Sequence, residues 1–158
     1  MTDARFEDGA ERPLRLIAAD AADVQVLSAI VQDAVLAASD ISWKPKKRQA
    51  AFLINRFRWE DADAAKAQGR PPERVRAMLV IDDAHAMRGA GITPQDKDAV
   101  LSILAITHTT EEGSDRLTLT FAGDGEIALD VEAVNITLSD VTRPYVAPSG
   151  KVPGHDLT

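Results

Sequence analysis

The first regular pattern in the chain is helical. After Asp20, apolar residues recur every three or four positions, at Val24, Leu27, Ile30, Val31, Ala34 and Val35. This spacing places them on one face and predicts a helix from about Ala21 to Asp33. Asp20 offers an N-cap oxygen, and Asp23 adds negative charge to the first turn. The apolar run Leu14 to Ala18 predicts a short strand before the helix.

From Val35 onward the apolar period changes to two, which is the period of β-strands. The chain between 60 and 73 is polar and rich in alanine, and it predicts a surface excursion with at most one helical turn. The loop expected over 89–98 is marked by glycine and proline. The predicted strands cover residues 35–43, 48–59, 74–81, 84–89, 100–108, 116–121 and 126–131.

A hairpin is predicted around Gly123-Asp124-Gly125, between the alternating runs 116–121 and 126–131. Glycine and aspartate accept the positive φ angles that a tight turn requires. Up to Val131 the apolar residues occupy odd-numbered positions, and past Glu132 they occupy even-numbered ones. A slip of one turns side chains to the opposite face, so it predicts a bulge or bend near Ala133.

These elements predict an α+β fold that is mainly β. We expect an antiparallel sheet or a partly open barrel of about seven or eight strands, with one N-terminal helix. Residues 14–142 should form a single domain. The polar segment 1–13 is expected to be a disordered lead, and the proline- and glycine-rich segment 143–158 a loose tail.

Composition narrows the class of protein. The chain has 158 residues, no cysteine, and no apolar run of the roughly 20 residues that cross a bilayer. Its start resembles no signal peptide, so we expect a cytoplasmic protein without membrane contact. The net charge of −7 disfavours nucleic acid as a partner. Residues 44–76 nevertheless carry +6, while residues 111–140 carry −7.

No sequence motif for catalysis is present: the chain lacks a phosphate-binding GxxxxGK[ST] loop, GxGxxG, HExxH and GxSxG. No cofactor is expected. One alternative is a metal site, because Asp83 and His85 would point the same way on a strand and His108 lies in a later strand. The other interpretation of His108 is a polar strand end between threonines.

The segment 55–60 combines aromatic and basic residues and is the main candidate site. Trp59 could stack on a ligand while arginines hold a phosphate or carboxylate. In the alternative interpretation, the tryptophan is core and the arginines pair with the acidic hairpin. The strand 48–59 is expected to become basic on one face at its end and to reach solvent there. The candidate ligand-binding residues are Asn55, Arg56, Arg58, Trp59, Glu60, Arg74 and Arg76.

Four short segments resemble a known family. They are Leu14 to Ala18, Gln32 to Val35, Leu53 to Glu60 and Leu117 to Gly123. Their order is similar to that of the bacterial family catalogued as domain of unknown function 2948, and the resemblance covers about Leu14 to Val141. The resemblance implies no activity, substrate, cofactor or catalytic residue, because none is assigned to the family.

Three functions remain open at this point. The absence of a catalytic motif favours a non-catalytic binding or adaptor domain whose partner is a protein or a small anionic ligand. A small enzyme would use Asn55, Arg56, Glu60 or the metal group, and a polyanion or nucleic-acid binder would use the stretch of charge +6. Open sheet edges are also compatible with a homodimer.

Overall fold

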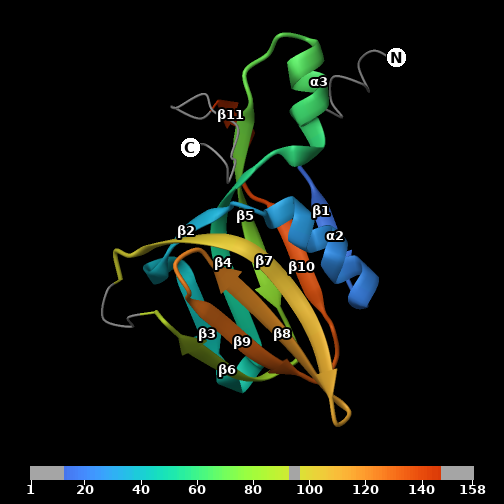
Figure 1. Ribbon diagram of the computed structural model, residues 1–158, viewed down its shortest axis with the longest axis vertical. Coiled ribbons are helices and arrows are strands. Elements are labelled where there is room, and N and C mark those ends of the chain that lie inside the picture. The colour runs from blue at the N-terminus through green and yellow to red at the C-terminus, as the bar shows by residue number, and fades with distance from the viewer. Residues whose placement is uncertain (1–12, 93–96, 147–158) are drawn as a thin grey trace.

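The computed structural model describes residues 13–92 and 97–146 (Figure 1). Most of the predicted lead (1–13) and most of the predicted tail (143–158) therefore lie outside the described residues. The elements, in chain order, are β1 (Arg15–Ala18), α2 (Ala21–Val31), β2 (Val35–Ala37), the 3₁₀ turn η1 (Ala38–Asp40), β3 (Ile41–Lys44), η2 (Pro45–Lys47), β4 (Gln49–Phe57), η3 (Trp59–Asp61), α3 (Ala62–Ala67), β5 (Glu73–Ile81), β6 (Ala84–Ala90), β7 (Val100–Glu111), β8 (Ser114–Phe121), β9 (Glu126–Val131), β10 (Ile136–Asp140) and β11 (Tyr145–Val146).

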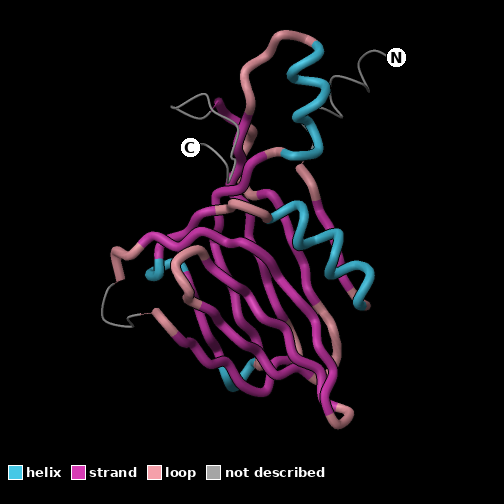
Figure 2. The backbone as a smooth tube through the Cα atoms, viewed as in Figure 1, coloured by secondary structure: helices cyan, strands magenta, loops and turns pink. Residues whose placement is uncertain are grey.

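The strands form one antiparallel sheet, which is strongly curved and stays open (Figure 2). Its main path runs β1-β10-β5-β4-β2-β7-β8-β9-β6, with β3 paired to β4 and β11 paired to β5. The α+β, mainly antiparallel fold class is therefore confirmed. The described sheet has eleven strands rather than seven or eight, because the predicted strand 35–43 is divided into β2 and β3, and β10 and β11 also join the sheet.

Helix α2 begins where the sequence predicts. The backbone N–H of Asp23 donates to Asp20 Oδ1 at 2.8 Å, which caps the first turn. Val24, Leu27 and Val31 are buried, and α2 packs mainly on β7 while also contacting β1 and β4. No helix in the described ranges is long and apolar enough to cross a lipid bilayer.

Alternation along the strands builds one core inside the curve of the sheet. On β4 and β5 the buried side chains alternate with partly exposed ones, as the period of two predicts. The same holds for β8, β9 and β10, and most of the inward apolar side chains of these strands join α2 in one apolar cluster. Each strand therefore has an inner face toward the core and an outer face toward solvent.

The excursion between β4 and β5 is more ordered than predicted. It contains α3, a second helix, so the expectation of one helix is wrong. Figure 1 places α3 beyond the body of the sheet, where β4 and β5 continue as an arm. Strand β11 pairs with the arm, with Tyr145 opposite Arg74 and Val146 opposite Glu73. Ordered chain thus continues past the predicted domain boundary at residue 142.

The predicted strand 35–43 is broken in the middle. Val35 pairs with Asn55, but Ile41 pairs with Phe52. Five residues, 36–40, therefore lie opposite only two of β4, an excess of three residues. The chain accommodates them because β2 turns away to pair with β7 and η1 leads back to β3. Such a bulge interrupts the ladder and leaves a gap beside β4.

The two predictions for the second half of the chain are confirmed. Gly123 and Asp124 have φ angles of 85° and 72°, and they turn the chain between β8 and β9. After Val131 the chain bends and leaves β9 for β10, which pairs with β1 and β5. The slip in apolar phase therefore marks a passage from one part of the sheet to another.

Candidate functional site

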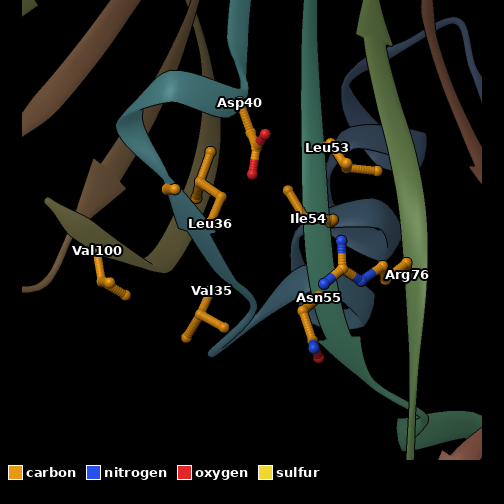
Figure 3. Close-up of a pocket in the computed structure, with 9 residues that line it drawn as sticks. Val35, Leu36, Asp40, Leu53, Ile54, Asn55, Arg76 and Val100 are labelled. Atoms are coloured by element: carbon orange, nitrogen blue, oxygen red, sulfur yellow. The ribbon is translucent and has the colours of Figure 1, made fainter. Parts of the chain in front are cut away.

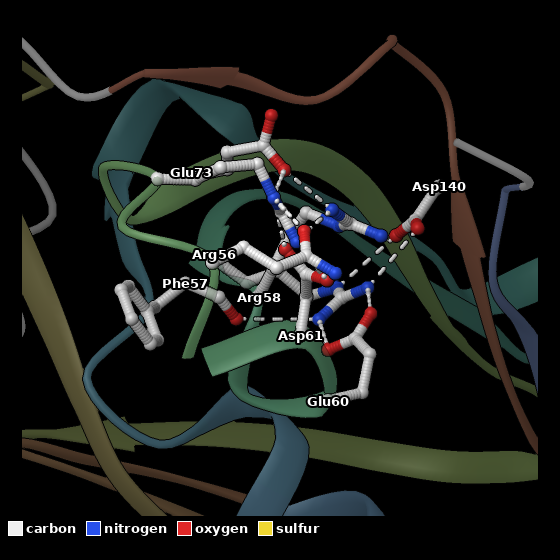
Figure 4. A network of polar contacts seen from close by, with 9 residues as sticks. Arg56, Phe57, Arg58, Glu60, Asp61, Glu73 and Asp140 are labelled. Carbon is white, nitrogen blue, oxygen red and sulfur yellow. Dashed lines mark hydrogen bonds and ion pairs between the residues drawn. The ribbon is translucent and has the colours of Figure 1, made fainter. Parts of the chain in front are cut away.

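Arg56 does not reach solvent, contrary to the sequence-based expectation. Its side chain is fully buried, and it lies between two carboxylates (Figure 4). It donates to Glu60 at 2.9 and 2.7 Å and to Asp140 at 3.1 and 3.0 Å. Both contacts are bidentate, the geometry that suits a planar guanidinium. Arg56 therefore joins the end of β4 to η3 and to β10.

This arrangement keeps both partners charged. Burial opposes the charge of Arg56, but its hydrogen bonds with Glu60 and Asp140 outweigh burial and raise its pKa above the usual value. Burial alone would raise the pKa of Glu60, yet the hydrogen bonds from Arg56 hold it below its usual value. Glu60 is thus a poor proton donor near neutral pH, and the pair has no free group with which to bind a ligand.

Arg58 has a similar structural role in the arm. It lies 2.6 Å from Glu73 and 3.3 Å from Asp61, and Arg70 also contacts Asp61 at 3.1 Å. These contacts tie η3 and the chain after α3 to the start of β5. The partners of Arg56 and Arg58 are not the acidic hairpin residues, so that part of the alternative interpretation is wrong.

Trp59 is held in place by its neighbours. Its Nε1 donates to the backbone oxygen of Gln32 at 3.0 Å. The centroid of its ring lies 4.6 Å from the ring centroid of Phe57, in an edge-to-face contact. The side chain is half-buried. Trp59 links η3 to the C-terminal end of α2, so it has a structural role in the described residues.

Asn55 and Arg74 lie on the other face of the same strands. Arg74 donates to the side-chain oxygen of Asn55 at 2.6 Å and to its backbone oxygen at 2.9 Å, and Asn55 donates to the hydroxyl of Tyr145. Partial burial lowers the pKa of Arg74. These contacts anchor β11, an element that the sequence did not predict.

Arg76 differs from the other arginines of the candidate set. Its side chain is exposed on the outer face of β5, and it has no hydrogen-bond or ion-pair partner among residues 13–92 and 97–146. It lines a pocket of about 240 Å³, which we call the β2–β4 pocket. The pocket lies in the gap beside the three-residue excess, and Figure 3 shows Arg76 reaching across β4 toward it. The lining residues are Val35, Leu36, Ala37, Asp40, Leu53, Ile54, Asn55, Arg76 and Val100.

A wider surface adjoins this pocket. We define the outer face as the solvent side of β1, β10, β5 and β4. Two rows of paired residues cross it, Ile17-Thr137-Val80-Ala51 and Arg15-Ser139-Met78-Leu53. Ile17 is 59% exposed, and the other apolar members of the two rows are partly exposed. Across these four strands, the charged side chains on this face are Arg15, Arg74 and Arg76, and none is acidic.

The alternative metal site does not form. His85 lies on β6 and His108 on β7, with β9 and β8 between them. Three strand spacings of about 4.8 Å separate them by roughly 14 Å, whereas ligands of one ion lie within about 4 Å of each other. His108 instead contacts Asp115 at 2.8 Å, and Asp83 accepts from Asn135 at 3.1 Å. No group of three potential metal ligands occurs in the described part of the chain.

Comparison with known proteins identifies the family. The family described as "Protein of unknown function (DUF2948)" matches residues 14–155, nearly the whole chain. The chain belongs to this family. The resemblance seen in the sequence is therefore confirmed, and the family description itself assigns no activity. No curated protein and no solved structure gives a significant match to this DUF2948 chain.

Asp140, Tyr145, Asp40 and the outer face were missed by reasoning from the sequence. Asp140 had a usable signal: it has the same parity as buried Ile136 and Leu138, which places a carboxylate on an inward face. The β2–β4 pocket had no such signal in the sequence, because it depends on the register in which residues 35–41 pair with β4.

Proposed function

We propose that this chain is a non-catalytic binding domain that docks an acidic, partly apolar segment of a partner protein on its outer face. The observation that carries the proposal is the composition of that face. Partly exposed Met78, Val80 and Leu53 form an apolar area on β5 and β4 beside Arg76. Thr137 and Ser139 of β10 separate this area from exposed Ile17 and from Arg15 on β1. A contiguous apolar patch with a basic border is typical of a protein-binding surface.

Charge supports an acidic partner. The chain as a whole has a net charge of −7, yet the outer face carries arginines without acidic residues. Complementary charge would steer an acidic segment to this face. A second copy docked here about a twofold axis would place Arg15 and Arg76 against the same basic area, which opposes self-association through this face.

The alternatives have less support. The candidate catalytic groups Arg56 and Glu60 neutralise each other, and His108 is engaged with Asp115. Several arginines of the stretch of charge +6 have acidic partners in the described structure, including Arg48, Arg56, Arg58 and Arg70, so that stretch offers polyanions less free charge. The lack of cysteine accords with a cytoplasmic location, which we include in the proposal.

The test uses a displayed library of random peptides, selected on the full chain. A Met78→Asp/Val80→Asp variant serves for counter-selection, because two added carboxylates oppose an acidic peptide on the outer face. Thr118→Asp is the matched control, since Thr118 has a similar partly exposed place on the outer side of β8. Melting temperatures verify that both variants are folded.

The proposal predicts that selected peptides combine acidic with apolar residues, bind the control variant, and lose at least tenfold in affinity on the double variant. Enriched peptides that are basic or that bind the double variant unchanged would contradict it. So would the absence of any enriched peptide.

A further inference from the structure

We propose that the β2–β4 pocket is a binding site for a compact aliphatic carboxylate, with Arg76 as the partner of the carboxylate group. The site is separate from protein docking on the outer face, although Leu53 and Arg76 border both. The shared chemistry is a short branched hydrocarbon ending in a carboxylate. A free small acid and the C-terminal residue of a peptide both have it.

The shape of the site follows from the strand register. Residues 36–40 bulge away from β4, so the pocket has side chains of β2 on one side and of β4 on the other. Val35, Leu36, Leu53 and Val100 provide apolar walls. Val100 is 73% exposed although it is a large apolar residue, and a bound hydrocarbon would cover it.

The volume limits the ligand. At about 30 Å³ for one water, 240 Å³ corresponds to roughly eight non-hydrogen atoms. A branched acid of six carbons has this size. Pockets for nucleotides and drug-sized molecules begin at about 300 Å³, so the volume of this pocket suits a smaller ligand better.

Two charged residues orient such a ligand. Arg76 has no ionic partner in the described ranges, which makes it the available cation of the pocket. Asp40 lies near the other end, and Figure 3 shows its carboxylate directed into the same gap. Asp40 repels a carboxylate, so the acid group should point to Arg76 and the hydrocarbon toward Leu36. The same repulsion should exclude dicarboxylates.

The experiment is an NMR titration of the full chain with 4-methylpentanoate, and its isosteric amide serves as the neutral control. We expect the acid to shift backbone signals of Val35, Leu36, Leu53 and Ile54, with a Kd on the order of a millimolar, as suits so few atoms. The amide should bind at least tenfold more weakly, because a hydrogen bond to a charged group is lost.

Variants test the assigned roles. Arg76→Gln should lower affinity at least tenfold, whereas Arg15→Gln, at another exposed arginine of the outer face, should leave it unchanged. Asp40→Asn should admit glutarate, which the unaltered chain rejects. Ile17→Asp should weaken protein docking on the outer face but leave acid binding intact, because β10 and β5 separate Ile17 on β1 from the pocket beside β4, so the two proposals fail independently.

A second arm separates the two sources of the carboxylate. A peptide ending in leucine with a free C-terminus is compared with its C-terminal amide and with the free acid. Tighter binding of the free-ended peptide assigns the site to a protein C-terminus, and binding of the small acid alone assigns it to a free molecule. The proposal is overturned if neither shifts the pocket signals, if amide and acid bind equally, or if Arg76→Gln binds as well as the unaltered chain.

Discussion

Two clusters that pair arginine with carboxylates in this molecule use the same chemistry in opposite surroundings. At the root of the arm, Arg56 lies buried between Glu60 and Asp140. On the outer side of β8 and β9, Asp130 lies between Arg88 and Arg116, all partly exposed to solvent. Pairing alone therefore says little about structural importance. Burial decides it, because water screens the second cluster and cannot replace the partners in the first.

The comparison also explains the candidate site. The sequence grouped Arg56, Arg58, Arg74 and Arg76 because they are close along the chain. The structure separates them by strand face: Arg56 and Arg58 are buried with carboxylates, and Arg76 is exposed beside a pocket. Only an arginine without a protein partner is available to a ligand.

The largest expected effect is from Arg56→Met. It leaves Asp140 buried without its cation, which should lower the free energy of unfolding by about 3–5 kcal/mol. Chemical denaturation measures the loss. Arg76→Met should change stability by less than about 0.5 kcal/mol. Adding Asp140→Leu to Arg56→Met should recover much of the lost stability. A small effect of Arg56→Met alone would contradict the claim that burial makes this cluster important for stability.

The pH dependence of stability is the next test. The pKa of Glu60 is lowered in the folded chain from its ordinary value of 4.5, so its ion pair stabilises the fold above about pH 4.5. This stabilisation is lost as the pH falls through the lower, folded value. The stability advantage of the unaltered chain over Glu60→Gln should hence be constant from pH 7 to 5 and should shrink below pH 4.5. An advantage that grows on acidification would show that the pKa of Glu60 is raised rather than lowered in the folded chain.

Trp59→Phe should have a moderate effect. The change keeps an aromatic ring beside Phe57 but removes the hydrogen bond to Gln32, which contributes about 0.5–1.5 kcal/mol. Trp43→Phe is the matched control, since Trp43 is also half-buried and has no hydrogen bond from its ring within the described residues. Thermal unfolding of both variants isolates the hydrogen bond, and equal losses would argue that it contributes nothing.

The smallest effect is expected at the exposed cluster. Arg116→Gln removes a hydrogen bond of 2.9 Å to Asp130, but Arg88 remains as a partner. Stability should fall by less than about 1 kcal/mol, and molar salt should abolish the difference. Denaturation at low and high salt measures both. A loss comparable to that of Arg56→Met would remove the distinction between the two regions.

Much of the fold was predictable because it depends on local pattern. Helix α2, the turn at Gly123-Asp124 and the bend after Val131 follow from apolar period, capping and glycine placement. The arm was less predictable, since α3 has only six residues and is stabilised by ion pairs across η3 and β5. At the site, Arg56 and Asp140 each lie two residues after a buried apolar residue of the same strand. Strand alternation therefore already indicated that both side chains face the core.

The sequence by itself determined the periods of most elements, their order and the alternation of side chains along β4, β5, β8 and β9. Those properties depend on neighbours within a few positions. Only the tertiary structure decided which strands lie together, that residues 36–40 exceed their partners on β4, and that the side chain of Arg76 has no partner in the described chain. The physical reason is that strand register and ion pairing join residues far apart in the chain, as with Arg56 and Asp140, and local pattern cannot fix such distances.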